Sequence, residues 1–268
     1  MSTVYLKTIF STDSEYPFVT LNLLESYDYV DCFLVCEANR THTGLPRDYI
    51  FDIEKIPSSK RHKIKHIKMD VSKHTVVSPD DEQKCHAINE KYIRGSFVQE
   101  VSLKDDDIIF SVDADEIIYG HLYPELLDVV RKEQVIQLQL HQFFYKMNYY
   151  WVNNKFRAPI GVRAARYKNI FPLDWRYDGS IYPVTAGCHF SWCMPVEELL
   201  LKMQNYAHAA AVSHLASKEI LKNAIENKVY PFDLTRKFVI QELDYDKDSH
   251  LYPQSFLDNR DIFSREVL

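Results

Sequence analysis

The stretch Asp107-Ile-Ile-Phe-Ser-Val-Asp-Ala-Asp-Glu-Ile-Ile118 decides the fold of this chain and the place of its chemistry. An apolar run typical of a buried β-strand ends on three carboxylates, Asp113, Asp115 and Glu116, and the chain then becomes apolar again. Because burying a carboxylate without a counter-charge is costly, we expect these acids at the end of the strand, on the rim of a sheet. In open α/β sheets this rim is where ligands bind.

The spacing of the acids adds a chemical expectation. Residues i and i+2 of a strand point to the same side, about 6.6 Å apart, so Asp113 and Asp115 are expected to face one polar site beside the small Ala114. Oxygen ligands suit Mn²⁺ or Mg²⁺, which bind few protein carboxylates and complete their shell with phosphate oxygens and water. The motif predicts a divalent-metal site for a nucleotide diphosphate. Since D-x-D is short and common, a strand end followed by an acidic turn fits it equally well.

The composition is that of an ordinary folded enzyme. The 268 residues are 46% apolar and 13% aromatic, which is enough for a sizeable core and argues against disorder. Only six glycines are present, and neither a Gly-rich dinucleotide motif nor a Walker-type phosphate loop occurs. The net charge of −6 gives no reason to expect nucleic acid as a partner.

The chain shows no sequence signal for a membrane or a secretory pathway. No apolar stretch approaches the roughly 20 residues of a transmembrane helix, and residues 1–10 lack the basic and apolar regions of a signal peptide. We therefore expect no transmembrane segment and a cytoplasmic location, in a microbial cell or a virus-infected host. The five cysteines are expected to be reduced, buried thiols rather than zinc ligands.

Hydrophobic periodicity predicts alternating strands and helices in the first half of the chain. Strands are expected at 3–10, 31–37, 62–69, 107–112 and 134–145, and helices at 17–27, 81–101 and 122–132. This β-α-β order predicts an α/β fold with a mostly parallel, Rossmann-like central sheet flanked by helices.

The pattern changes after about residue 145 to short aromatic and Arg-rich segments, and helices are expected again at about 195–207 and 216–228. No repeat or low-complexity linker divides the chain. We therefore expect one domain over 1–268, with a nucleotide-binding half at 1–145 and an acceptor-side half at 146–268.

A second cluster of chemically useful residues lies at Gly187-Cys-His-Phe-Ser-Trp-Cys193. Trp192 is able to stack on a sugar face, and His189 is able to bind a metal or donate to a phosphate. The same residue types, taken alone, favour a buried aromatic turn with a satisfied histidine.

Four stretches, in this order, resemble motifs of glycosyltransferase family 17, the β-1,4-mannosyl-glycoprotein 4-β-N-acetylglucosaminyltransferase-like enzymes. They are Val30 to Gly44 (VDCFLVCEANRTHTG), Glu90 to Arg94 (EKYIR), Asp107 to Ile117, and Gly187 to His208, which includes Glu197 and Lys202. The resemblance covers roughly residues 1–210.

The chain departs from the family pattern at several points. Cys188 stands where the family usually has Trp, Val196 where it often has Pro, and Ser14-Glu15-Tyr16 replaces the usual Asn-Glu-Leu after the first strand. We also expect no membrane anchor of the kind that the Golgi members carry. These differences bear on the donor sugar and the acceptor more than on the reaction class.

The resemblance implies a GT-A type fold and a metal-dependent, inverting transfer from a UDP-sugar such as UDP-GlcNAc. The acceptor would be a hydroxyl of a glycan, glycolipid or glycoprotein. Mn²⁺ or Mg²⁺ would neutralise charge on the departing UDP, and its expected ligands are Asp113, Asp115, His189 and His208. The residues expected to contact the nucleotide-sugar are Glu37, Arg94, Asp113, Ser191, Trp192 and Lys202.

Several of these positions also have structural readings. Arg94 is suited to an ion pair with Asp113, and Glu37 to the role of a simple strand-end acid. A histidine near a helix end, such as His208, often serves as a cap.

Inversion in one displacement needs a general base near the acceptor hydroxyl. Glu197, which matches a family position at the start of a helix, is the first candidate. Its alternative is a stabilising interaction with the helix macrodipole. Asp178, in the polar loop Trp175 to Gly179, is the second candidate.

Two other functions compete with a transferase. A phosphohydrolase of the haloacid-dehalogenase type also ends a strand in D-x-D, but it needs Thr or Val two residues after the second Asp and an early position in the chain. Here Glu116 and Ile117 follow, deep in the sequence. A non-catalytic carbohydrate-binding protein is the other alternative, and the intact acidic triplet argues against it.

Overall fold

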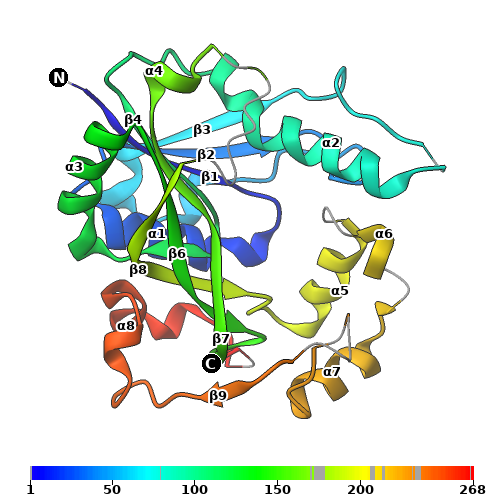
Figure 1. Cartoon of the computed structure of the whole chain (residues 1–268). Coiled ribbons are helices and arrows are strands. Elements are labelled where there is room, and N and C mark those ends of the chain that lie inside the picture. Colours follow the sequence, from blue (N-terminus) through cyan, green and yellow to red (C-terminus); the bar gives the residue numbers. More distant parts are fainter. Residues whose placement is uncertain are drawn as a thin grey trace.

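The computed structural model of the chain describes residues 2–78, 80–169, 171, 179–205, 209–212, 215–230, 232, 237–265 and 267–268. Within them, nine strands form one curled sheet that helices flank (Figure 1). The strands are β1 (Val4–Ile9), β2 (Cys32–Ala38), β3 (Ile64–Met69), β4 (Ile108–Asp113), β5 (Glu116–Ile118), β6 (Val135–Phe144), β7 (Lys146–Arg163), β8 (Ser180–Ser191) and β9 (Ile240–Glu242). The helices are α1 (Tyr16–Ser26), α2 (Glu82–Gly95), α3 (Tyr123–Glu133), α4 (Ala164–Tyr167), α5 (Val196–Asn205), α6 (Ala209–Val212), α7 (Lys218–Glu226) and α8 (Gln254–Asp258).

The sheet has a parallel half and a mixed half. Its strand order is β3-β2-β1-β4-β7-β6-β8-β5, and β9 pairs with β7. The first four strands in this order are mutually parallel. Beyond them, only the β6–β8 pair is parallel, and β7 joins both β4 and β6 in antiparallel fashion. The predicted α/β fold with a Rossmann-like sheet flanked by helices is confirmed. The expectation of a mostly parallel sheet holds only for the N-terminal half, because four of the eight strand pairs in the described residues are antiparallel.

The strands and helices expected before residue 145 are all present in the expected order. The expectation of short segments after this point is wrong for 146–163, which forms the long strand β7. Its pairing with β6 shifts register between Gln137 and Gln139, which leaves 158–159 without a ladder partner. Because Pro159 has no N–H to donate, such a bulge lets the strand continue past it. Hydrogen bonding to β4 and β6 on both sides therefore keeps β7 extended, although its own sequence lacks a regular strand pattern.

The central strand β4 shows how the sheet becomes buried on both faces. Its residues Ile108, Phe110 and Val112 pack in the hydrophobic cluster with α1 and α3, whereas Ile109 packs in the cluster that contains the end of α2. Side chains that alternate along a strand point to opposite faces, so helices cover both sides. Asp113, the last residue of β4, is the first in this strand at which a charge can meet solvent.

The C-terminal segment braces the strands that carry the second motif. Phe256 is fully buried, and its ring lies 5.6 Å from that of Phe190 in β8 and 5.9 Å from that of Phe263. The carboxylate of Glu25 in α1 accepts hydrogen bonds from Gly120 N and Ser255 N, both at 2.8 Å. One half-buried acid thus ties α1 to both the segment after β5 and the helix α8.

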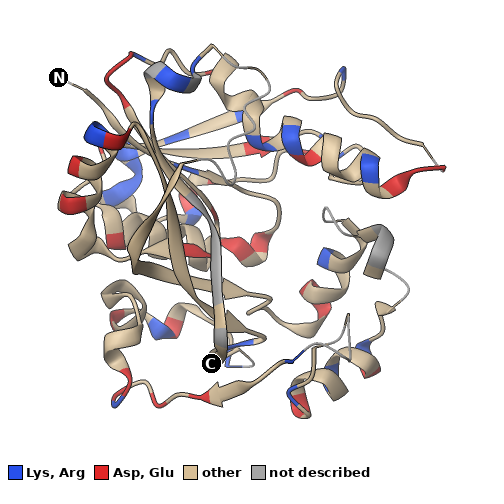
Figure 2. Cartoon of the chain, viewed as in Figure 1, with Lys and Arg blue, Asp and Glu red and all other residues tan. Residues whose placement is uncertain are grey.

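The structure shows where the charged residues and the cysteines lie. In Figure 2, basic and acidic residues are interspersed along α2 and α3. In the part of the chain that the structure describes, no helix has both the length and the apolar character of a membrane span. All five cysteines are free thiols, and four of them are buried.

Replacing Phe256 with Ala should lower the free energy of unfolding by about 3–5 kcal/mol, because the cavity opens beneath the strand that carries His189. Phe171 is 36% exposed and offers a matched control. Phe171→Ala should lower the free energy of unfolding by about 1 kcal/mol or less. Urea denaturation of the three proteins measures both effects. Equal losses for the two substitutions would show that the C-terminal segment does not brace the sheet.

Candidate active site

The acidic motif forms a tight turn rather than a continuous strand. β4 ends at Asp113, Ala114 and Asp115 make the turn, and β5 begins at Glu116. The buried Glu116 closes the turn by accepting a hydrogen bond from Asp113 N at 2.6 Å. Asn22 of α1 donates to Ala114 O at 2.9 Å. The turn is therefore fixed by groups inside it and by the helix beneath it.

Strand pairing brings the second motif to this turn. β5 runs antiparallel to β8, with Glu116 opposite His189, and Phe190 N donates to Asp115 O at 2.8 Å. The two motifs, which lie more than 70 residues apart in sequence, are thus joined by backbone hydrogen bonds.

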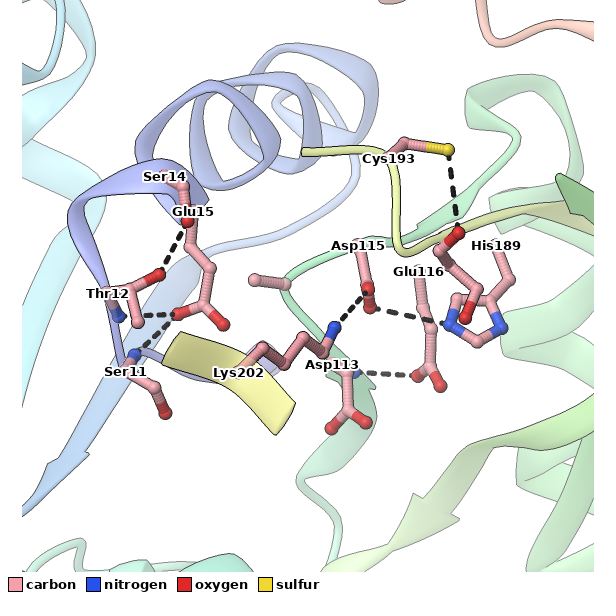
Figure 3. Close-up of polar contacts among 12 residues, drawn as sticks. Ser11, Thr12, Ser14, Glu15, Asp113, Asp115, Glu116, His189, Cys193 and Lys202 are labelled. Atoms are coloured by element: carbon pink, nitrogen blue, oxygen red, sulfur yellow. Dashed lines mark hydrogen bonds and ion pairs between the residues drawn. The ribbon is translucent and has the colours of Figure 1, made fainter. Parts of the chain in front are cut away.

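Asp115 lies between two nitrogen groups (Figure 3). Its Oδ1 is 3.6 Å from His189 Nε2, and its Oδ2 is 3.5 Å from Nζ of Lys202 in α5. The residue is only 8% exposed. A carboxylate with so little water around it favours a cation beside it, because burial strengthens the attraction between opposite charges.

Asp113 has a different environment, and the expectation that both acids share one strand face is wrong. Arg94 Nη2 donates to Asp113 Oδ2 at 2.9 Å, and Arg94 Nη1 contacts Oδ1. The Nε of Arg94 also donates to Glu90 Oε1 at 2.8 Å. Both oxygens of Asp113 are therefore engaged in a bidentate ion pair, as the structural reading of Arg94 predicted. Of the two acids, Asp115 is the one that lies beside His189 and Lys202.

Asp115 and His189 are the two of the expected metal ligands whose side chains the structure brings together. The described residues contain no group of three or more His, Cys, Asp or Glu side chains arranged around one ion position. Two protein donors nevertheless suit Mg²⁺ or Mn²⁺, which take further ligands from phosphate and water. His208, the fourth expected ligand, lies outside the described residues.

Glu37 holds a loop in place. Its buried carboxylate accepts hydrogen bonds from Arg47 Nη2 at 3.0 Å, Ile50 N at 2.7 Å and Phe51 N at 3.1 Å. His66 Nε2 also lies 3.0 Å from Oε2 of Glu37. With its oxygens so occupied, Glu37 anchors residues 40–51 and has little capacity left for the expected contact with a nucleotide.

Trp192 and Ser191 lie at the end of β8, so the second motif is largely strand rather than turn. Trp192 is 6% exposed and its ring stacks on Phe144, with the centroids 6.1 Å apart. Its φ of 62° is unusual for a bulky residue. Because its faces are covered, Trp192 shapes the wall of the site and does not present an open surface for the expected stacking on a sugar. Ser191 is also buried, at 8% exposure.

Of the two candidate general bases, the structure describes Glu197 but not Asp178. Glu197 begins α5 with its side chain 59% exposed and forms an ion pair with Lys218 of α7. The hydrogen bond from Lys218 lowers the pKa of Glu197. A lower pKa makes a carboxylate a weaker proton acceptor at neutral pH, so this geometry does not favour Glu197 as the base. Asp178 lies outside the described residues.

Glu15 is a carboxylate that the sequence interpretation did not single out as a site residue. Its Oε2 accepts hydrogen bonds from Ser11 N and from Thr12 N, the latter at 3.2 Å, in a capping box at the end of β1. Loss of hydration, together with repulsion from Asp115, raises the pKa of Glu15 to about 7, against the attraction of Lys202. Figure 3 shows its carboxylate directed toward Lys202. The Thr12-x-x-Glu15 pattern marks a capping box in sequence, but only the fold places it beside Asp115.

The site lies where the strand order of the parallel half reverses. In the sheet, β1 lies between β2 and β4. Glu15 follows the carboxyl end of β1, and Asp115 follows the carboxyl end of β4. This is the topological switch point at which Rossmann-like enzymes bind ligands. The model of glycosyltransferase family 17 matches residues 2–243, and the chain belongs to this family. It is therefore a glycosyltransferase, as its motifs indicated.

Other comparisons are more distant. Comparison with curated proteins found no match. Among solved structures, S. aureus TarS (residues 1–349) has a TM-score of 0.32 and 11% identity, over 57% of this chain and 37% of that one. Mouse xyloside xylosyltransferase 1, apo form, has a TM-score of 0.27 and 8% identity, over 52% of each chain. The family assignment rests on the family model alone.

Replacing Glu15 with Gln should change how stability depends on pH. A folded-state pKa of about 7, above the ordinary value of 4.5, means that folding favours the protonated acid. The contribution of the protonated Glu15 to the free energy of unfolding is present in full below pH 4.5 and is lost as the pH rises through 7. The wild type should therefore lose about 1–2 kcal/mol relative to Glu15→Gln between pH 4.5 and 7.5. Urea denaturation in chelator measures this, and a constant difference over the range would contradict it.

Proposed function

We propose that the protein moves a sugar, GlcNAc-like, from a UDP-sugar to a hydroxyl of a glycan, glycolipid or glycoprotein, with inversion and with Mn²⁺ or Mg²⁺ as cofactor. The observation that supports this most directly is the environment of Asp115, which lies at the switch point between His189 Nε2 and Lys202 Nζ.

The charge balance of the site favours a diphosphate. A phosphate group approaching Asp115 alone would be repelled, and a divalent cation on Asp115 and His189 removes that repulsion. When bound, the metal acts as a Lewis acid that neutralises charge on the departing UDP. Lys202, whose side chain is 26% exposed, offers a second positive charge from α5 to a phosphate oxygen.

The same geometry supports Glu15 as the proton acceptor. An inverting displacement requires the acceptor hydroxyl to lose its proton as it attacks. Two backbone N–H groups fix Oε2 of Glu15, and in the described part of the chain Oε1 accepts no hydrogen bond. A fixed carboxylate with a pKa near neutrality suits this role better than the exposed, Lys-paired Glu197.

The Asp115→Asn variant should lose metal-dependent binding of the donor. Titration calorimetry of UDP and a panel of UDP-sugars, with Mn²⁺ and then with chelator, measures this. Wild type should bind UDP at least about 100-fold more tightly with Mn²⁺, and Asp115→Asn should lose most of that gain, since the carboxylate no longer offsets the charge of the ion. The sugar that binds most tightly identifies the donor.

Asp128→Asn is the matched control, because Asp128 in α3 has an 80% exposed side chain and pairs with the exposed Arg131. It should bind UDP like the wild type. No UDP binding by the wild type under any condition would refute the proposal. Release of phosphate from a simple ester would instead favour the phosphohydrolase, and sugar binding without turnover the carbohydrate-binding protein.

A further inference from the structure

We propose that Gln142 in β6 is a positioning residue that fixes the tautomer of His189, so that the lone pair of His189 Nε2 points at the cation position beside Asp115. This inference rests on the proposed function and assigns a role to a residue that no motif identifies.

The first step is the hydrogen bond between the two side chains. His189 Nδ1 lies 3.0 Å from Gln142 Oε1, and the two residues are 8% and 3% exposed. An amide oxygen can only accept a hydrogen bond, so Nδ1 of His189 must carry the proton.

The second step is the orientation of the amide itself. Gln142 Nε2 donates to Phe143 O at 3.2 Å. Rotating the amide by half a turn would place Oε1 against this carbonyl oxygen, two acceptors facing each other, and would lose the bond. The orientation that satisfies Phe143 is therefore the one that directs Oε1 to His189.

The third step is that the sheet holds the pair together. Gln142 and His189 are register partners on the adjacent parallel strands β6 and β8. Their spacing is set by backbone pairing, and their burial excludes water that would otherwise compete for the Nδ1 proton.

The consequence appears on the other side of the ring. A neutral imidazole carries one proton, so a proton on Nδ1 leaves Nε2 with its lone pair, and Nε2 faces Asp115 Oδ1 at 3.6 Å. Two acceptors that face each other across this distance define a position that favours a cation. Histidines that bind metals usually donate their other N–H to a partner such as an amide or a carboxylate, which fixes the ring and its tautomer.

The experiment compares Gln142→Met, which removes the acceptor at similar volume, with Gln142→Glu, which retains it. Gln139→Met is the matched control, since Gln139 lies on the same strand and its amide donates to Tyr182 O at 3.1 Å without contacting His189. Binding of Mn²⁺ alone and with UDP is followed by electron paramagnetic resonance. Gln142→Met should weaken Mn²⁺ binding by about 10–100-fold, and Gln139→Met should remain near the wild type. Gln142→Glu keeps the acceptor for His189 Nδ1 but loses the donor to Phe143 O, so its Mn²⁺ affinity should lie between the two.

A second readout needs no metal. Nitrogen-15 NMR of histidine-labelled, metal-free protein reports the tautomer, and the His189→Asn variant assigns the signal. The wild type should show His189 protonated on Nδ1 alone, and Gln142→Met should lose this preference.

A wild-type His189 protonated on Nε2, or unchanged Mn²⁺ binding in folded Gln142→Met, would overturn this inference alone. If the wild type has the Nδ1 tautomer but binds neither Mn²⁺ nor UDP, the proposed function fails, and the role of Gln142 at a metal site fails with it.

Discussion

The closed turn between β4 and β5 is the constraint on which the rest of the site depends. Because Glu116 accepts the N–H of Asp113, the chain reverses within two residues and β5 can pair with β8. That pairing sets His189 beside Asp115 through backbone hydrogen bonds, which are rigid compared with contacts between side chains. The acids of the motif are thus divided: one closes the turn, one pairs with an arginine, and one faces the cation position.

Charge compensation explains why so many acids are tolerated near a core of aromatic and aliphatic residues. Glu37 and Glu25 are satisfied by backbone N–H groups from loops and helix ends, and Asp113 by Arg94. Removing one partner from such a pair leaves a buried charge uncompensated, which costs more than the pair itself contributes. Asp115 differs because its nearest cationic partner, Lys202, comes from α5 at 3.5 Å.

Two sets of aromatic side chains support the strands that bear the site. On one side Phe190 packs against Phe143, with their centroids 5.1 Å apart, and the C-terminal Phe256 covers both strands. Just past the same end of β8, the stacking of Trp192 on Phe144 joins the sheet to α5 and α7. The position of Lys202 therefore depends on packing that lies outside the acidic motif.

The sequence by itself determined the α/β class, the order of the predicted elements to residue 145 and the family, because period-2 and helical patterns and local motifs are properties of neighbouring residues. It also singled out Asp115, His189 and Lys202, which the structure brings together. The ion pair of Arg94 with Asp113 and a buried aromatic turn at Trp192 were open alternatives in the sequence, and the tertiary structure decided for them. Nothing in the sequence indicated that Glu15 and Gln142 would border the site. Those outcomes depend on contacts between residues far apart in the chain, which the tertiary structure alone specifies. The length of β7 was decided in the same way, since its strand partners, and not its own irregular pattern, supply its backbone hydrogen bonds.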